Sequence, residues 1–215
     1  MNIFEHIEFT QLNPATTERD IIDLCLLANE QQLRTVCVNS SYVSLTKELL
    51  NNNNIGICSV IGFPFGATDT ASKIHEAQAA IANGASEIDM VINLGLLKSR
   101  NYVSVLKDIS DVKLAIGTTP LKVTLEVSEL NKNEIIKACQ ICMDAKVDYI
   151  KTSTGFSKSG VTLTVIKIIK KTIKNTIKIC AFHGIDDEET AFKYLDLGVD
   201  RIGVSSEFKI RKVAA

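Results

Sequence analysis

Short runs of β-branched residues alternate along the chain with longer stretches in which apolar residues recur at helical spacing. Eight of these runs are predicted to be strands, at residues 6–10, 35–39, 56–62, 87–93, 121–127, 147–153, 177–182 and 201–205. Their starts lie about 21 to 34 residues apart, which is the length of a strand plus one crossover helix. The pattern predicts an α/β fold, a (β/α)8 TIM barrel; an open doubly wound sheet is the alternative that the same alternation permits.

The arrangement of apolar positions favours a single domain over residues 1–215. The predicted strand at 56–62 is almost continuously apolar, which is typical of strands covered on both faces. Between two strands, Ile135, Cys139 and Cys142 fall on one face of a helix and predict a single apolar stripe. No linker divides the chain, and no repeat of residue identity accompanies the repeat of architecture.

Composition and charge exclude several classes of protein. The chain has 24 Lys and Arg against 25 Asp and Glu, so its formal net charge of −1 offers no global positive field to nucleic acid or to a membrane surface. We therefore expect no nucleic-acid partner and no membrane association. Six cysteines in a chain of 215 residues are expected to be reduced, buried thiols. The Cys139–Cys142 pair has no second pair beside it and is interpreted as helix packing, not as a zinc site.

The amino-terminal segment and the longest charge-free stretch predict a cytoplasmic protein. The first twenty residues lack a basic end followed by an apolar block, so no signal or transit peptide is expected. The stretch at 49–68 contains four consecutive Asn and Pro64 and is not expected to span a membrane.

Charged residues inside apolar strands are the most informative positions, because Lys, Asp and Glu are rarely buried without a partner or a chemical role. Asp89, Glu126 and Lys151 lie within three of the predicted strands, near their carboxyl ends. Active sites of TIM barrels form at that end of the strands. We therefore expect these three side chains to point toward one mouth of the barrel.

Lys151 is the candidate nucleophile. A neutral lysine amine adds to aldehydes and ketones, but at the usual pKa of about 10.4 only about 0.04% of the amine is neutral at pH 7. Burial in the barrel mouth is therefore expected to lower the pKa of Lys151. The alternative is a structural role, in which Lys151 pairs with Asp89 or Glu126 or extends its amine to solvent.

Hydroxyl-rich turns follow two of the predicted strands. Residues 152–155 form a Thr-Ser-Thr-Gly run after Lys151, and residues 203–206 form a Gly-Val-Ser-Ser run after the last strand. In TIM barrels the loops after the last strands commonly hold phosphate. The two turns predict a phosphorylated carbonyl substrate, with Thr152 and Gly155 among its contacts.

Together these segments resemble the deoxyribose-phosphate aldolase family of class I, Schiff-base aldolases. The Lys-Thr-Ser-Thr-Gly-Phe run that begins at Lys151 is the most specific part of the resemblance. The resemblance implies a TIM barrel that cleaves 2-deoxyribose 5-phosphate to glyceraldehyde 3-phosphate and acetaldehyde, without a metal or organic cofactor, and that often forms a homodimer. It runs nearly end to end, through residues 8–14, 36–39, 60–66, 87–93, 97–99 and 151–156.

The resemblance also implies roles for individual residues. Lys151 would form the Schiff base, and Asp89 would work with water in proton transfer. Cys37 would lie near the substrate. The residues that match the phosphate-binding turns of the family are Gly155, Gly184, Gly203, Ser205 and Ser206.

One run departs from the family pattern. The family has Lys-Ala-Ser-Gly-Gly-Ile-Arg where this chain has Cys-Ala-Phe-His-Gly-Ile-Asp. The family lysine places a positive charge near the Schiff-base lysine and so favours its neutral form. Lys178 lies two residues before the changed lysine, about 6.6 Å along a strand, and is not expected to replace it. The four changed positions are Cys180, Phe182, His183 and Asp186.

These changes support a second hypothesis, an aldolase-derived barrel with lost or altered catalysis that binds a sugar phosphate or a protein partner. Phe182 and His183 add bulk where the family has a small turn around phosphate. His183 could contact an anion when protonated, or obstruct the pocket. A neutral Cys180 thiol would leave Lys151 unaffected, whereas a thiolate would stabilise its ammonium form.

Overall fold

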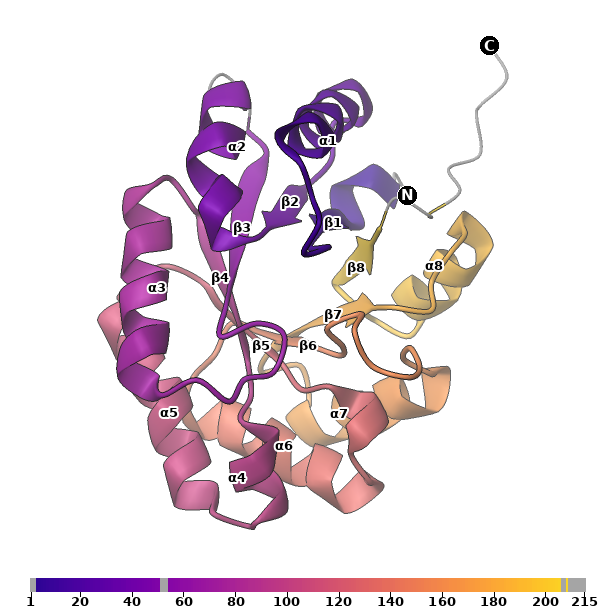
Figure 1. Ribbon diagram of the computed structural model, residues 1–215. Helices are drawn as coiled ribbons and strands as arrows, with labels where there is room; N and C mark the ends of the chain where they lie inside the picture. Colours follow the sequence, from indigo (N-terminus) through magenta and orange to yellow (C-terminus); the bar gives the residue numbers. More distant parts are fainter. Residues whose placement is uncertain (1–2, 51–53, 206–207, 209–215) are drawn as a thin grey trace.

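Eight parallel strands close into a barrel that helices surround (Figure 1). The structure is a computed structural model that describes residues 3–50, 54–205 and 208. The strands are β1 (Ile7–Gln11), β2 (Thr35–Val38), β3 (Gly56–Ile61), β4 (Glu87–Val91), β5 (Leu121–Thr124), β6 (Tyr149–Lys151), β7 (Lys178–Phe182) and β8 (Arg201–Val204). Each strand pairs with the next and β8 pairs with β1, so the predicted TIM barrel is confirmed and the open sheet is excluded.

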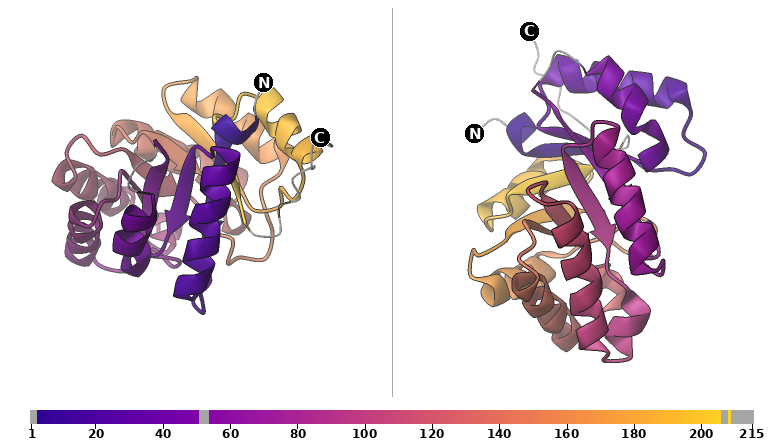
Figure 2. Two further views of the ribbon diagram at one scale, coloured as in Figure 1. Left: turned by 90° about the horizontal axis from the view of Figure 1, so that it is seen from above. Right: turned by 90° about the vertical axis from the view of Figure 1, so that its left-hand side faces the viewer.

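The helices lie outside the strands, as the side views in Figure 2 show. They are α1 (Glu18–Gln31), α2 (Val43–Leu49), α3 (Thr70–Ala82), α4 (Leu94–Lys98), α5 (Tyr102–Ala115), α6 (Lys132–Asp144), α7 (Leu163–Ile173) and α8 (Glu188–Asp196), with short 3-10 turns η1 (Ile3–His6), η2 (Ser40–Tyr42) and η3 (Val127–Glu129). Within the described ranges, no helix is long and apolar enough to cross a membrane. That residues 1–215 form a single domain stays a prediction.

Helix α6 illustrates how local sequence sets an element. Asn131 precedes it and accepts hydrogen bonds from backbone N–H groups of the first turn, while the Glu134 carboxylate accepts one from the backbone N–H of Asn131. The predicted stripe of Ile135, Cys139 and Cys142 is buried against the barrel, which confirms the packing role of the two thiols. All six cysteines are free and buried, as the composition predicts.

Several strands end before their predicted boundaries. β5 ends at Thr124, and Glu126 adopts a left-handed backbone conformation with a φ of 54°, which interrupts the extended chain. β6 ends at Lys151, so Thr152 and Ser153 belong to the following loop, although both are fully buried. The loop after β6 therefore begins inside the molecule and becomes exposed from Gly155 onward.

The strand register sends several polar side chains into the barrel. Asp89 pairs with Lys122, and Lys151 pairs with Thr124 on one side and Cys180 on the other. Register partners point to the same face of a sheet, as do residues two apart along one strand. Lys122 of β5 and Lys151 of β6 both contact Glu8 of β1, so that face is the barrel interior.

A buried ion pair outside the barrel joins α3 to α5. Lys73 is fully buried and its Nζ lies 2.7 Å from Oδ2 of Asp108. Because removal of one partner leaves an uncompensated buried charge, we expect Asp108→Ala to lower the free energy of unfolding by about 3 kcal/mol. Asp111→Ala, which breaks a partly exposed pair on the same helix, should change it by no more than about 0.5 kcal/mol. Urea denaturation checks both values, and equal effects would contradict the prediction.

Candidate active site

Charged side chains from five strands meet inside the barrel in one network, here called the core charge cluster. Three carboxylates face three cations, so the cluster is balanced in formal charge. Buried charges are tolerated when they are paired in this way. The members are Glu8, Glu87, Asp89, Lys122, Lys151 and Arg201.

Glu8 lies at the centre of the core charge cluster. Its Oε1 accepts a hydrogen bond from Lys151 at 3.1 Å, and its Oε2 accepts one from Arg201 at 3.1 Å and another from Lys122. Burial alone would raise the pKa of the Glu8 carboxyl, but the three cations hold it well below its usual range. Glu8 is therefore an anion at neutral pH.

Lys151 is held by two carboxylates. Its Nζ lies 2.9 Å from Oδ2 of Asp89 and 3.1 Å from Oε1 of Glu8, and its side chain is 1% exposed. Burial lowers the pKa of the Lys151 amine, but Asp89 and Glu8 outweigh burial and raise it well above its usual value. The prediction of a lowered pKa is wrong, because the strands that bury the amine also bring carboxylates to it.

Besides Glu87, three members of the core charge cluster were missed in the sequence, namely Glu8, Lys122 and Arg201. Each lies in a short apolar run, as Asp89 and Lys151 do, and each is at most 2% exposed. A search of the predicted strands for charged residues, which identified Asp89 and Lys151, would also have found these three. Their partners lie on distant strands, so the pairing itself has no local signal.

Cys180 contributes a neutral thiol at the edge of the core charge cluster. Its Sγ lies 4.0 Å from Oε1 of Glu8, and burial raises the pKa of the thiol to about 12. The thiol therefore adds no negative charge beside Lys151 at neutral pH. Lys178 is exposed at the start of β7, with its Nζ 5.4 Å from the centre of the Tyr149 ring, and does not take the place of the family lysine.

A cavity of about 460 Å³ opens at the carboxyl ends of β6, β7, β8 and β1. Four residues that match the family's phosphate turns line it: Gly155, Gly184, Gly203 and Ser205. Ser206, the fifth, lies outside the described residues. Glycines allow a ligand to approach the backbone closely. The cavity is therefore suited to a small polar ligand held by loop backbone and hydroxyl groups.

The ring of Phe182 lies between this cavity and Lys151. Phe182 lines the cavity, and its ring centre lies 4.8 Å from Nζ of Lys151, which does not line the cavity itself. The ring packs between the loop after β6 and strand β8: a Cβ at Gly155 would lie 3.0 Å from it, and a Cβ at Gly203 2.9 Å. A ligand that enters the cavity therefore meets Phe182 before it meets the amine.

His183 and Asp186 also line the cavity. His183 has a φ of 72°, a left-handed conformation that the glycine of the family adopts without strain. Its Nδ1 is buried and, within the described part of the chain, has no hydrogen-bond partner. His183 is the only basic residue among the described lining residues, and the Asp186 carboxylate opposes an anion.

Thr152 and Glu126 organise the loop after β6. The Thr152 hydroxyl donates to the carbonyl of Phe182 and accepts from its N–H, both at 3.0 Å, and Thr152 does not line the cavity. Glu126 accepts a hydrogen bond from Ser157 at 2.7 Å and two more from Thr154. Of the three charges expected at one mouth, Asp89 and Lys151 meet, whereas Glu126 anchors a loop because β5 ends before it.

Cys37 lies inside the barrel but not at the cavity. It is fully buried and packs with Leu12, Cys58, Val60 and Phe63. It therefore touches the apolar side of the barrel interior, next to Asp89 and not next to the proposed phosphate turns.

Replacing the Phe182 ring with a smaller side chain should expose the Lys151 amine to the cavity. We expect Phe182→Ser to increase the rate of imine trapping at Lys151 by about tenfold, because the ring no longer covers Nζ. The same change should lower the free energy of unfolding by about 3 kcal/mol, since it empties a buried aromatic site. Reductive trapping with acetaldehyde and urea denaturation measure the two effects. An unchanged trapping rate would show that Phe182 is no barrier.

The chain matches a family model described as DeoC/LacD family aldolase over residues 7–196. A protein of Mycoplasma capricolum named deoxyribose-phosphate aldolase is 43% identical over 206 residues, which cover 96% of this chain and 93% of the relative.

Solved structures agree with this match. A structure titled QR15, an aldolase, superposes with a TM-score of 0.92 at 37% identity, covering 96% of this chain and 92% of that one. The tetrameric deoxyribose phosphate aldolase of Aeropyrum pernix superposes with a TM-score of 0.88 at 29% identity, covering 97% and 88%.

Proposed function

The chain belongs to the DeoC/LacD family of aldolases, and on that premise we propose that it cleaves 2-deoxyribose 5-phosphate through a Schiff base on Lys151. The observation that carries the proposal is the hydrogen bond of 2.9 Å between Nζ of Lys151 and Oδ2 of Asp89, inside the barrel and one ring away from a ligand-sized cavity. An amine must lose a proton before it adds to a carbonyl, and a carboxylate in direct contact is placed to accept it.

The reaction begins with a proton transfer within the core charge cluster. Asp89 takes a proton from the Lys151 ammonium, and the neutral amine adds to C1 of the open-chain aldehyde. Loss of water gives an iminium, which draws in the electron pair of the C2–C3 bond as the C3 hydroxyl loses its proton. Glyceraldehyde 3-phosphate leaves, the enamine takes up a proton, and hydrolysis of the imine releases acetaldehyde and restores the amine.

The phosphate end of the substrate is proposed to lie in the cavity among Gly155, Gly184, Gly203 and Ser205. Backbone N–H groups and hydroxyls are suitable donors to an anion, and the glycines permit close approach. His183 lines the same cavity, and its ring N–H is a further candidate donor to the phosphate.

A second candidate is a barrel that binds a sugar phosphate without turnover. Two observations favour it: the balanced pairing keeps Lys151 in its ammonium form, and Phe182 covers the amine. Both features oppose imine formation and neither opposes ligand binding at the cavity. In this case the ligand would occupy the glycine turns and stop at the Phe182 ring.

Reductive trapping separates the two candidates. The protein is incubated with 2-deoxyribose 5-phosphate or acetaldehyde and with borohydride, and the labelled lysine is located by peptide mass spectrometry. We expect the adduct on Lys151 and none on Lys73, a second fully buried lysine that is paired with a carboxylate but lies away from the cavity. Because the pKa of Lys151 is raised, its neutral fraction and the trapping rate should increase from about pH 7 to about pH 9.

The outcomes are distinct. An adduct on Lys151 together with formation of glyceraldehyde 3-phosphate supports the aldolase reaction. Saturable binding of 2-deoxyribose 5-phosphate with neither adduct nor product, and with Lys151→Met binding equally well, supports the non-catalytic candidate and overturns the first.

We also propose that the protein forms a homodimer, as the family resemblance implies, and that it is located in the cytoplasm, as the sequence predicts. A related aldolase is described as a tetramer, which supports self-association of this chain. The number of chains in the assembly is what the experiment tests. Light scattering coupled to size-exclusion chromatography is expected to give twice the chain mass of 23.5 kDa. A monomer or a tetramer would contradict the homodimer.

A further inference from the structure

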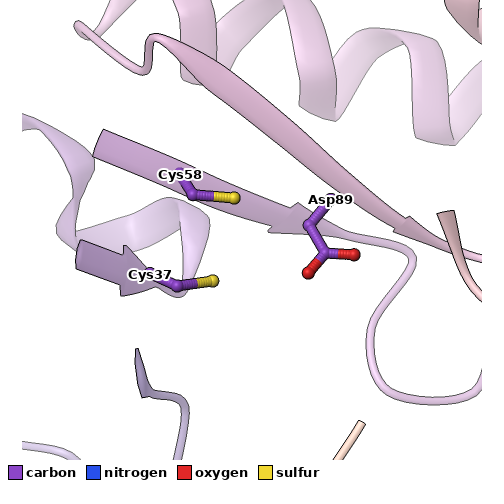
Figure 3. Close-up of side chains that lie close together, drawn as sticks. All are labelled: Cys37, Cys58 and Asp89. Atoms are coloured by element: carbon purple, nitrogen blue, oxygen red, sulfur yellow. The ribbon is translucent and has the colours of Figure 1, made fainter. Parts of the chain in front are cut away.

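Two thiols and a carboxylate converge inside the barrel from β2, β3 and β4. Figure 3 shows the side chains of Cys37, Cys58 and Asp89 pointing toward one another. Their Sγ atoms and a carboxylate oxygen lie within 4.8 Å of one another, and all three residues are at most 1% exposed. The proposed aldolase reaction uses Asp89 but gives the paired thiols no step.

We propose that Cys37, Cys58 and Asp89 form a binding site for a thiophilic divalent cation such as Zn²⁺. Two sulfurs and one oxygen are a donor set that Zn²⁺ accepts, and three protein ligands leave a fourth position for water or a small molecule. With Zn–S near 2.3 Å and Zn–O near 2.0 Å, tetrahedral donors are about 3.5 to 3.8 Å apart. The three donors therefore need to close by only about 1 Å.

A nearby cation favours a thiolate ligand at Cys58. A cysteine binds a metal ion as its thiolate and gives up its proton on binding. Lys122, with its Nζ 3.7 Å from Sγ of Cys58, is placed to donate to the resulting thiolate.

A competing set of donors is less suited to a cation. Glu8, Cys58 and Glu87 also lie within 4.8 Å of one another. Those two carboxylates already accept hydrogen bonds from Arg201, at 3.1 Å for Glu8 and 2.6 Å for Glu87. A metal there would have to displace a guanidinium from two carboxylates. Since Cys37 belongs to the first set alone, a Cys37 variant distinguishes the two sets.

Metal binding would take Asp89 from its present partners. Oδ2 of Asp89 accepts from Lys151 at 2.9 Å, and Oδ1 accepts from Thr124 at 2.7 Å. A cation on Asp89 removes the proton acceptor next to the amine, so the ion would be an inhibitor and not a cofactor. This consequence rests on the proposed function, whereas metal binding itself does not.

Access to the site is limited. Leu12, Val60 and Phe63 pack around the two thiols, and all three donor residues are at most 1% exposed. A cation reaches the thiols only when the apolar group opens. We therefore expect slow association of the cation with this site.

Co²⁺ is the probe for the test. The reduced protein is titrated with Co²⁺ alone, and thiolate-to-cobalt charge transfer is followed in the near ultraviolet. We expect one Co²⁺ per chain and loss of the band on addition of Zn²⁺. Cys37→Ser and Cys58→Ser should each weaken binding by at least about 100-fold, because loss of a direct ligand exceeds the effect of losing a supporting contact. Cys142→Ser, which removes a buried thiol from α6, should bind as the unchanged protein does.

A second measurement uses the unchanged protein, so that a poorly folded variant does not decide the question. Zn²⁺ should slow alkylation of Cys37 and Cys58 by iodoacetamide at least tenfold, as read by peptide mass spectrometry, and leave alkylation of Cys25 and Cys142 unaltered. No charge-transfer band, or a band that persists in Cys37→Ser, overturns the proposed site. Equal protection of all the cysteines overturns it too. If the metal binds and turnover is unaffected, only the inhibitory role is contradicted. If there is no turnover even without metal, the proposed function is contradicted and the metal site is not.

Discussion

Cys180→Lys is expected to raise the rate of imine formation at Lys151 by about 10- to 1000-fold at neutral pH, which corresponds to a fall of one to three units in the pKa of the amine. The reason is the charge count inside the barrel. At present three cations match three carboxylates, and nothing drives a proton off Lys151. A fourth cation at position 180 would compete with Lys151 for Glu8, whose Oε1 lies 4.0 Å from Sγ of Cys180.

The measurement is the rate of reductive trapping as a function of pH, which reports the pKa of Lys151 directly. Cys180→Met is the matched control, because it adds length at the same buried position without adding charge. A gain in Cys180→Lys alone assigns the effect to electrostatics. Equal rates in both variants, or a gain that needs Phe182→Ser as well, would show that access to the amine and not its protonation limits the reaction.

Glu8→Gln is expected to lower the free energy of unfolding by about 5 kcal/mol at pH 7. The change keeps the shape of the side chain but removes the carboxylate that Lys122, Lys151 and Arg201 share. Breaking a buried pair costs about 3 to 5 kcal/mol because the partner charge is left uncompensated, and here three partners are affected. Glu189→Gln, in an exposed pair with Lys193, should change the free energy by less than about 0.5 kcal/mol.

The same substitution should change the pH dependence of stability. The pKa of Glu8 in the folded protein is well below its usual value of 4.5, so its contribution is fully present above about pH 4.5 and is lost as the pH falls toward the folded-state pKa. Urea denaturation between about pH 7 and about pH 3 should show a steep loss of stability that is reduced in Glu8→Gln. An identical slope in the variant would show that other carboxylates control acid unfolding.

The Cys180→Lys and Glu8→Gln experiments test how the sequence changes around Cys180 affect the reactivity of Lys151. The family lysine, serine and glycine are replaced by Cys180, Phe182 and His183. In the structure Cys180 leaves the cluster balanced in charge, and Phe182 covers the amine. The substitutions therefore act on two separate requirements of an imine-forming lysine, its protonation state and its accessibility.

The alternation of apolar runs and helical stripes was enough to locate every strand and to favour a barrel, because each strand and helix carries its own local period. The pairing of β8 with β1 is what excluded the open sheet. The charges within strands likewise identified Lys151 and Asp89, which meet at 2.9 Å. The boundaries were less accurate: the left-handed turn at Glu126 depends on contacts with Thr154 and Ser157 that lie far along the chain.

The protonation of Lys151 was decided only by the tertiary structure. The carboxylate of Glu8 that helps to raise the pKa of this amine is 143 residues away in the chain and reaches it only when β1 and β8 close the barrel. The cover of Phe182 over the amine likewise depends on the packing of its ring between Gly155 and Gly203. Local sequence therefore determines which residues enter the barrel, whereas closure determines the charges that surround each of them, because electrostatic energy depends on distance in space and not along the chain.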